Sequence, residues 1–133
     1  EYIGEVKMGD RDGIGIFKFA NGSVYNGEWK NNVYEGRGEY TTPNGSKYIG
    51  EYKDGERCGN GASVWGSGHK YKGEYKGDEL CGQGTFTFAD GSKVMGEWRD
   101  SKLNGYAIHY GAAGNIIQKG IYKDNEWLHD KVN

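Results

Sequence analysis

Aliphatic side chains are scarce in this 133-residue sequence, and its apolar content is largely aromatic, with 11 tyrosines and four tryptophans. A compact core normally relies on leucine, isoleucine and valine, so the composition argues against an ordinary globular domain. Helices are disfavoured as well, because 25 residues are glycine and each glycine inside a helix costs roughly 1 kcal/mol relative to alanine. Proline occurs once, and no glycine-every-third period suggests collagen. The composition favours β structure.

Charge of one sign is also lacking, since 17 basic and 19 acidic residues leave a net charge of −2. Such a chain has no general field that would attract nucleic acid or an anionic membrane. No apolar run approaches the roughly 18 residues of a membrane span, and no signal peptide is visible. The sequence opens inside a repeat, so we expect a fragment of a longer protein. Two cysteines are too few for a disulfide framework and favour a reducing, intracellular compartment.

A period of 23 residues runs through the sequence, and eight columns of similar residues keep it over five copies. Each unit opens with tyrosine, except at Val94. A glycine, a glutamate, a mostly aromatic residue and a basic residue follow, and then a glycine pair and a closing glycine. The units span about 2–24, 25–47, 48–70, 71–93 and 94–117, with a partial unit at 118–133.

The period slips by one residue after the fifth unit, because Gly120 and Tyr122 lie 24 residues beyond their predecessors. The extra residue falls between Gly111 and Gln118. The last half-unit has no glycine pair, and such degradation is typical of a capping repeat.

Each unit predicts two short antiparallel strands. Residues 25–30 alternate, with Tyr25, Gly27 and Trp29 on one face. We expect a polar loop at 31–35, a second strand at 36–42, and a tight return turn with positive φ at Asn44–Gly45. The predicted fold is all-β: an elongated, single-layer antiparallel β-meander of about eleven strands, roughly 50 Å long at a strand spacing of about 4.8 Å.

The glycines have a packing role in this prediction. A ring can lie flat over a strand glycine because no Cβ blocks it. We expect the aromatic at the fifth position of each unit, such as Trp29, to lie across from or diagonal to glycines of neighbouring strands. Rings and gaps would then interlock along the sheet.

Three consecutive segments carry a family resemblance: YNGEWKNNVYEGRGEYTTPNGSK, YIGEYKDGERCGNGASVWGSGHK and YKGEYKGDELCGQGTFTFADGSK. They closely resemble MORN repeats, whose pattern is Y-x-G-E-W, then G-x-G, then a D/N-G turn. The resemblance covers essentially the whole chain and is closest to the repeat-only MORN scaffolds of protozoan cytoskeletons. It implies a single-layer sheet with an aromatic groove, partner proteins, self-association and, in some members, phosphoinositide binding. Val94, Ala107 and the slip after Gly111 depart from the pattern, so the resemblance does not extend the groove beyond about residue 105.

Seven rings are the candidate partner groove. A single-layer sheet has no second layer to cover them, and exposed apolar patches usually mark interaction sites. Tyrosine and tryptophan are also favoured at binding hot spots. The alternative for any one ring is that it simply packs in the core. The seven rings are Tyr25, Trp29, Tyr48, Tyr52, Tyr71, Tyr75 and Trp98.

Six lysines are the candidate lipid contacts, since each lysine near an anionic surface contributes about 1 kcal/mol. The alternative is a solvated, charge-paired face, because Glu28 lies two residues before Lys30 and the arrangement repeats. The six are Lys30, Lys53 and Lys76 of the basic column and Lys47, Lys70 and Lys93 of a second row.

No catalytic, metal or cofactor site is expected. The glutamate columns repeat identically, whereas active sites are unique places, and no nucleophile or P-loop motif appears. Cys58 and Cys81 share one phase of the repeat at about 9.6 Å, beyond the roughly 7 Å limit for a disulfide. Small buried residues, or an intermolecular zinc site with a histidine, are the alternatives for them.

Most of the aliphatic weight of the last 30 residues lies in the terminal half-unit. An open sheet must protect its last edge, so a local cap is one interpretation. The other is a homodimer that buries the last repeats of two chains. The candidate interface residues are Ile116, Ile117, Ile121, Tyr122, Trp127 and Leu128.

The sequence therefore predicts a non-enzymatic scaffold that homodimerises through its C-terminal repeats and binds cytoskeletal or cortical proteins. We expect a cytoplasmic, cytoskeleton-associated location, beneath a membrane if lipids contribute. The alternatives are a phosphoinositide-binding module and a regulatory arm of an enzyme domain outside this segment.

Overall fold

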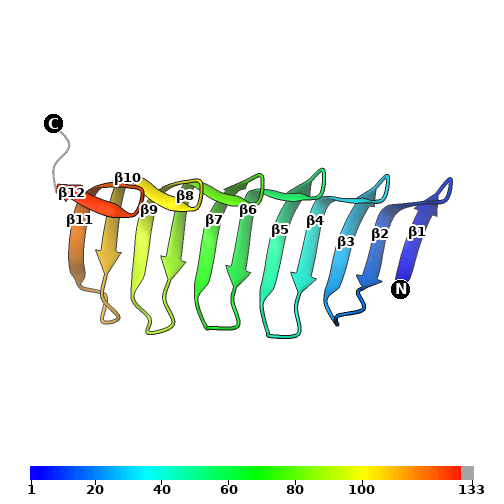
Figure 1. The fold of residues 1–133 in the computed structure, drawn as a ribbon, viewed down its shortest axis with the longest axis horizontal. Helices are drawn as coiled ribbons and strands as arrows, with labels where there is room; N and C mark the ends of the chain where they lie inside the picture. Colours follow the sequence, from blue (N-terminus) through cyan, green and yellow to red (C-terminus); the bar gives the residue numbers. More distant parts are fainter. Residues whose placement is uncertain (130–133) are drawn as a thin grey trace.

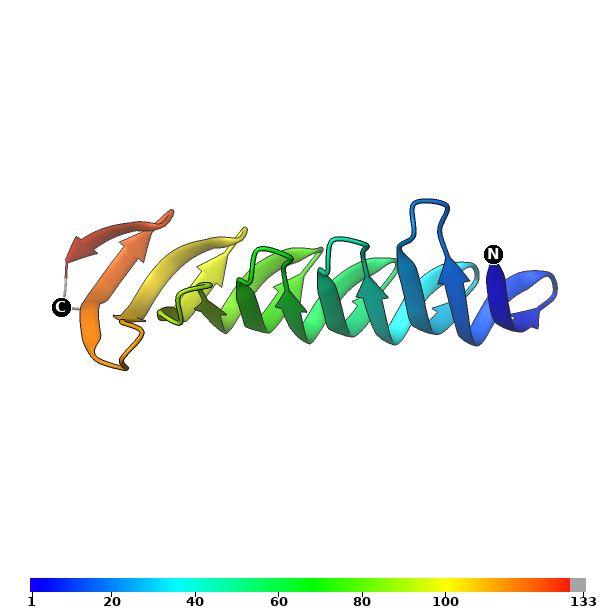
Figure 2. The same cartoon turned by 90° about the horizontal axis from the view of Figure 1, so that it is seen from below.

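The computed structural model describes residues 1–129, and it arranges them as one twelve-stranded sheet in which sequence neighbours pair antiparallel (Figure 1). A perpendicular view shows the same hairpins as one curved layer (Figure 2). The predicted all-β meander is confirmed, with twelve strands instead of eleven. They are β1 (Tyr2–Lys7), β2 (Asp10–Lys18), β3 (Val24–Lys30), β4 (Val33–Thr41), β5 (Lys47–Lys53), β6 (Glu56–Val64), β7 (Lys70–Lys76), β8 (Glu79–Thr87), β9 (Lys93–Arg99), β10 (Lys102–Tyr110), β11 (Ile116–Lys123) and β12 (Glu126–His129).

Two-residue turns join the strands at one edge of the sheet. Asn31 (φ 49°) and Asn32 (φ 71°) connect β3 to β4, and Lys30 pairs directly with Val33. Left-handed φ at both central residues suits the strand twist and is tolerated by asparagine. The predicted polar loop at 31–35 is therefore wrong, because β4 begins at Val33.

Five-residue loops join the strands at the opposite edge, between paired residues such as Thr41 and Lys47. The predicted positive φ of the closing glycine is confirmed at Gly45, with φ 90°. The predicted tight turn lies inside this loop, where the Gly45 N–H donates to the Thr42 carbonyl at 3.1 Å and the Thr42 N–H donates to the Ser46 carbonyl at 3.0 Å. The Asn44 side chain accepts the Ser46 N–H at 3.0 Å, which holds the loop by an asparagine turn.

Each even-numbered strand from β2 to β10 is bulged at the first glycine of its glycine pair. In β4 this is Gly36 (φ 74°), and the pairing register with β3 shifts beside it. The Glu28 carboxylate accepts the N–H of Arg37, the next residue, at 2.5 Å. Glu5, Glu51 and Glu74 make the same bond in their units. The glutamate column thus satisfies the backbone at the bulge, where strands bend.

The first tyrosine of a unit is the ring that lies over a glycine. A Cβ built on Gly38 would lie 2.6 Å from Cε1 and Cζ of Tyr25, so no other residue fits there. The Tyr25 hydroxyl donates to the Glu28 carbonyl at 2.8 Å. The same packing places Tyr2, Tyr48 and Tyr71 over Gly15, Gly61 and Gly84.

The fifth-position ring lies across from a glycine, as predicted: Trp29 pairs with Gly13 in the register of β2 and β3. The ring that lies over the second glycine of the pair is the tyrosine, which the sequence did not indicate. Trp29 also donates its Nε1–H to the Gly15 carbonyl at 3.0 Å, which ties one unit to the one before it.

The irregular fifth unit follows the same packing rule. Val94 replaces the tyrosine, and Ala107 replaces the glycine that a tyrosine ring would cover. Ala107 is fully buried, so its methyl group occupies space that a ring fills elsewhere. The phase slip is a bulge at Ile117, because Tyr110 pairs with Ile116 and His109 with Gln118. This falls inside the predicted interval.

Candidate functional site

A row of side chains on the even-numbered strands covers the aromatic rings on the inner face of the sheet. This covering row contains Arg11, Tyr34, Arg57, Leu80 and Leu103, spaced by 23 residues. Tyr34 stacks on Tyr25 with centroids 3.9 Å apart. The Arg57 guanidinium lies 5.3 Å from the Tyr75 ring centroid. In this single-layer sheet, side chains of the even-numbered strands therefore cover the rings of the odd-numbered strands.

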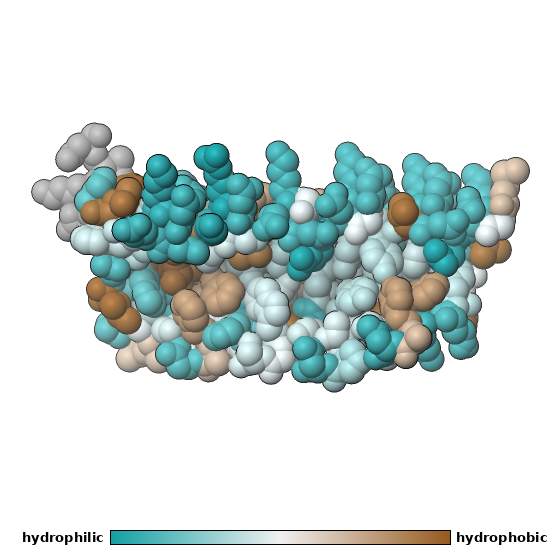
Figure 3. All heavy atoms as spheres, viewed as in Figure 1, coloured by the Kyte–Doolittle hydropathy of each residue, from teal (hydrophilic) through white to brown (hydrophobic). Residues whose placement is uncertain are grey.

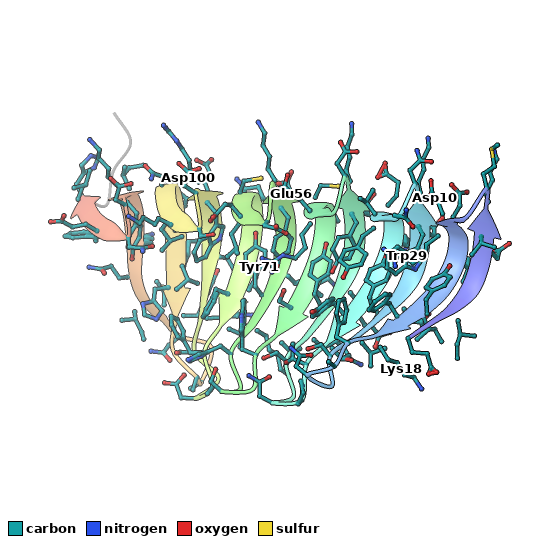
Figure 4. All side chains as sticks on the ribbon, turned by 45° about the vertical axis from the view of Figure 1, so that its right-hand side comes forward. Asp10, Lys18, Trp29, Glu56, Tyr71 and Asp100 are labelled. Carbon is teal, nitrogen blue, oxygen red and sulfur yellow. The ribbon has the colours of Figure 1, made fainter. Side chains whose placement is uncertain are left out.

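The seven rings of the predicted partner groove are buried core residues. Their exposed fractions run from 0% at Tyr25 to 9% at Trp98. Tyr71 and Trp29 lie within the curve of the strands (Figure 4). These rings can form the floor of a binding surface, but they offer little area of their own to a partner.

A groove opens where the covering row becomes aliphatic, at Leu80 and Leu103. Its volume is about 850 Å³. Val94 deepens it, because a tyrosine stands at this position in units one to four. The other apolar walls are Trp65, Phe86, Phe88, Trp98, Tyr122 and Trp127. Apolar side chains form a band across this face, below a rim of hydrophilic ones (Figure 3).

The sequence did not support a groove beyond about residue 105, but this groove continues past that residue. The departure at Val94 does not close the inner face, because Val94 lines this groove. Gln118, Tyr122 and Trp127, from the last half-unit, complete the wall.

The walls of this groove are held by hydrogen bonds between units. The Leu80 N–H donates to Ser101 Oγ at 3.1 Å, and the Leu103 N–H donates to Asn125 Oδ1 at 2.8 Å. Trp98 Nε1 donates to the Gly84 carbonyl at 3.0 Å. Because each covering residue is fixed by the next turn along the chain, the groove is largely preformed.

Sequence reasoning missed the more accessible rings of the inner face. These rings follow the second glycine of the pair by two or four residues and form two columns of the 23-residue period, which Ser63 and Thr42 interrupt. The sequence signal that could have found them is the alternation of aromatic and polar residues after each glycine pair, which places the rings on the inner face. The half-buried rings are Phe17, Phe19, Tyr40, Trp65, Phe86 and Phe88.

The six predicted lipid lysines lie in two rows at opposite edges of the sheet. Lys30, Lys53 and Lys76 end their strands at the two-residue turns, whereas Lys47, Lys70 and Lys93 begin theirs at the long loops. The expected glutamate pairing is wrong, since Glu28 and its equivalents bind backbone N–H groups. Opposite charge comes instead from across the strand pair, where Lys53 faces Glu56 and Lys76 faces Glu79. Lys47 makes an ion pair with Glu39 at 3.0 Å.

The predicted dimer residues do not form one patch. Tyr122 is buried and belongs to the core, and Ile121 is half-buried. Ile116 and Ile117 are 53% and 59% exposed at the long-loop end of β11. The other two, Trp127 and Leu128, are 40% and 48% exposed in β12, which pairs with the far end of β11. Residues 130–133 of the partial unit lie outside the described part of the chain.

The two cysteines are free, half-buried thiols. Burial raises the pKa of both Cys58 and Cys81, so neither is an activated nucleophile. No cluster of three or more metal-ligating side chains occurs among residues 1–129. In the same residues, no helix is long and apolar enough to cross a membrane.

A comparison with protein families matches the MORN repeat at residues 2–24, 25–47, 48–70, 71–93 and 95–116. The five matches together cover most of the chain and include every full unit. A comparison with curated proteins finds no match. The repeat that builds the groove is thus the repeat of this family, which generally mediates binding to proteins or membranes.

Proposed function

This chain belongs to the MORN-repeat family, and from that membership we propose that it is a non-enzymatic scaffold that holds a segment of a partner protein on its inner face. The observation that carries the proposal is the preformed apolar groove around Val94, Leu80 and Leu103. A groove of this kind, which combines aromatic and aliphatic walls with polar side chains such as Arg57, Glu79 and Gln118, is typical of peptide and ligand sites. We further propose a cytoplasmic location at the cytoskeleton or cell cortex.

The groove has an internal test, because the chain itself shows how to fill it. Val94→Tyr together with Ala107→Gly restores the tyrosine and glycine of the other units. The new ring should lie over the glycine introduced at position 107, as Tyr71 lies over Gly84. The double variant should therefore fold normally while losing groove depth.

Binding is measured with peptides selected against the wild-type chain from a displayed random library. We expect the double variant to bind them at least about tenfold more weakly, since a lost apolar anchor costs about 1.4 kcal/mol or more. The matched control, Met95→Leu, changes an exposed neighbour outside the groove. Unchanged affinity in a folded double variant would refute the groove as the binding site.

Phosphoinositide binding is the second candidate and rests on the lysine rows. It is less well supported, because the rows lie at opposite edges and acidic residues face much of the basic column. We expect neither the wild-type chain nor the Lys30→Glu, Lys53→Glu double variant to bind phosphoinositide vesicles above background at physiological salt. If the vesicles capture the wild-type chain and the double variant is not captured, the lipid function is established instead.

Homodimerisation through the C-terminal repeats remains part of the proposal. The exposed Ile116, Ile117 and Leu128 support it, as does the short outer strand β12, which pairs with three residues of β11 within the described chain. Light scattering should give twice the monomer mass at high micromolar concentration. Ile117→Lys with Leu128→Lys should return it to the monomer mass. A monomeric wild-type chain at that concentration would rule the dimer out.

A further inference from the structure

Two arginines occupy the same position of the covering row, two units apart. Arg11 lies in β2 and Arg57 in β6. Both place a guanidinium over aromatic rings: Arg11 Cζ lies 4.9 Å from the Trp29 ring centroid, and Arg57 Cζ lies 5.3 Å from that of Tyr75. Such cation–π contacts stabilise the charge of a guanidinium but use none of its N–H donors along the plane.

The Arg57 guanidinium is neutralised within the chain. Its Nε lies 3.1 Å from Asp78 Oδ1 in an ion pair, and its Nη2 donates to the Asp78 carbonyl at 2.9 Å. Asp78 is supplied by the two-residue turn of the next unit, where its φ is 69°. The carboxylate oxygen and the backbone carbonyl of one residue thus satisfy two donors of the guanidinium, and the carboxylate bond is charge-assisted.

The Arg11 guanidinium lacks this counter-ion. The position equivalent to Asp78 is Asn32, with a φ of 71°, and the neutral amide cannot supply the charge. Asn32 Oδ1 accepts the Arg11 backbone N–H at 2.8 Å, and the Asn32 carbonyl accepts a hydrogen bond from Arg11 Nη2 at 3.3 Å. Among residues 1–129, Arg11 Nε is the one buried side-chain nitrogen or oxygen without a hydrogen-bond partner. Buried donors are normally satisfied, so this one requires an explanation.

The neighbouring carboxylates are engaged elsewhere. Asp10 Oδ1 accepts the Asn32 side-chain N–H at 2.7 Å, and Asp12 Oδ2 is 3.4 Å from the Asn31 N–H. Glu5 accepts the Ile14 N–H at 2.7 Å. None of the three makes an ion pair with Arg11 in the described chain.

Arg11 also lines a niche of about 200 Å³ on the inner face. Phe17, Phe19, Trp29 and Tyr34 form its aromatic walls, and Asn32 and Val33 its rim. The niche has room for one side chain. Its walls are apolar and its one charged group is a cation, so it is complementary to an acidic side chain whose methylene groups pack on the rings.

We propose that Arg11 forms a carboxylate-binding subsite that takes an aspartate or glutamate side chain of a partner peptide. The Arg11 guanidinium, which within residues 1–129 has an unsatisfied Nε–H and no carboxylate partner in its aromatic niche, carries this inference, and the Arg57–Asp78 ion pair shows what the missing group is. The subsite adds to the partner-binding surface proposed above and rests on it. A recessed niche between rings favours a protein side chain over a lipid headgroup at the flat surface of a bilayer.

The chain supplies its own matched variants. Asn32→Asp installs at Arg11 the turn residue that neutralises Arg57, and Asp78→Asn removes that residue from Arg57. Each new residue already stands in the equivalent turn at nearly the same φ, so both turns should keep their backbone. Asn32→Asp also removes the bond to Asp10 Oδ1, so this variant is made together with Asp10→Asn, whose amide can donate to the new carboxylate. Asn32→Asp should close the subsite, and Asp78→Asn should open a second one at Arg57.

The assay follows the arginine Nε–H signals of the ¹⁵N-labelled chain by NMR during titration with capped Leu-Glu-Leu and, as the neutral match, capped Leu-Gln-Leu. We expect the glutamate peptide to give a saturable shift of the Arg11 signal, and the glutamine peptide to bind with an affinity at least about tenfold lower. Asn32→Asp should abolish the shift, and Asp78→Asn should transfer a similar one to the Arg57 signal.

Three results would overturn the proposal: equal responses to both peptides, an unchanged response in Asn32→Asp, or a response only to inorganic phosphate or phosphoinositide vesicles. The last would assign the site to phosphate groups instead. Trp98 Nε1–H, in the distal groove, is recorded in the same spectra with the library-selected peptides. Failure at Arg11 with a retained Trp98 response would remove the subsite while leaving the proposed function intact.

Discussion

Replacement of Gly38 by alanine tests the packing of rings over glycines. Tyr25 is fully buried, and the added Cβ would lie 2.6 Å from two of its ring carbons. Real Cβ contacts of this length do not occur, so the ring must move. Three losses then follow: overpacking strain of about 1–3 kcal/mol, part of the Tyr25–Tyr34 stacking at about 0.5–1.5 kcal/mol, and the bond from the Tyr25 hydroxyl to Glu28 at about 1 kcal/mol. We expect Gly38→Ala to lower the free energy of unfolding by about 3 kcal/mol in total.

The control for this change is the pair that the chain uses in its fifth unit. In a Tyr25→Val background, the space over residue 38 is free, as it is at Val94 and Ala107. Adding Gly38→Ala to that background should change stability by less than about 0.5 kcal/mol, because the two positions are directly coupled. Urea unfolding followed by tryptophan fluorescence measures all four members of the cycle. An equal cost of Gly38→Ala in both backgrounds would refute the reasoning.

Three further predictions concern the remaining parts of the fold. Burial raises the pKa of the tyrosines on the inner face, for example to about 12 at Tyr34. The free energy of unfolding should therefore be constant below the unfolded tyrosine pKa of about 10 and fall above it. Alkaline titration followed by ultraviolet absorbance should show one steep transition, whereas gradual tyrosine ionisation in a still folded chain would contradict this. Glu51→Ala should cost about 1–2 kcal/mol in urea unfolding, because it removes the acceptor of the Asn60 N–H at 2.8 Å, and no loss would show that water replaces it. Trp98→Phe should cost about 1 kcal/mol by removing the bond to Gly84, and hydrogen exchange should rise around β8 and β9; uniform exchange would argue against a local tie.

The fold could be predicted from the sequence because its determinants are local and repeated. Alternation in residues 25–30 and the 23-residue period define antiparallel neighbours without any long-range information. The glycine pairs indicated a close approach of a ring, and the structure confirms that approach. The choice between Tyr25 and Trp29 could not be made from the pattern, because both lie on one face and both reach glycines of a neighbouring strand.

The site was harder to predict, because it depends on residues that break the repeat. Val94, Leu80 and Leu103 open the groove by being smaller or more apolar than their equivalents in other units. All three keep the 23-residue period, Val94 as the exception in the tyrosine column and Leu80 and Leu103 in a column whose chemistry changes from unit to unit, so the prediction did not use them. Burial of Tyr25 and its equivalents was one of two interpretations of these rings, and the sequence could not decide between them, since the covering row of Arg11, Tyr34, Arg57, Leu80 and Leu103 has no shared chemistry to mark it.

Contacts between tyrosine rings and glycine Hα protons are the most direct test of a one-layer sheet held by rings over glycines. NMR should show nuclear Overhauser effects from Tyr25, Tyr48 and Tyr71 to the Hα protons of Gly38, Gly61 and Gly84, with those protons moved well upfield by the ring currents. The Ala107 signals, beneath Val94, should lack the shift. Ordinary glycine Hα shifts, or ring contacts to a second layer of strands, would contradict the account.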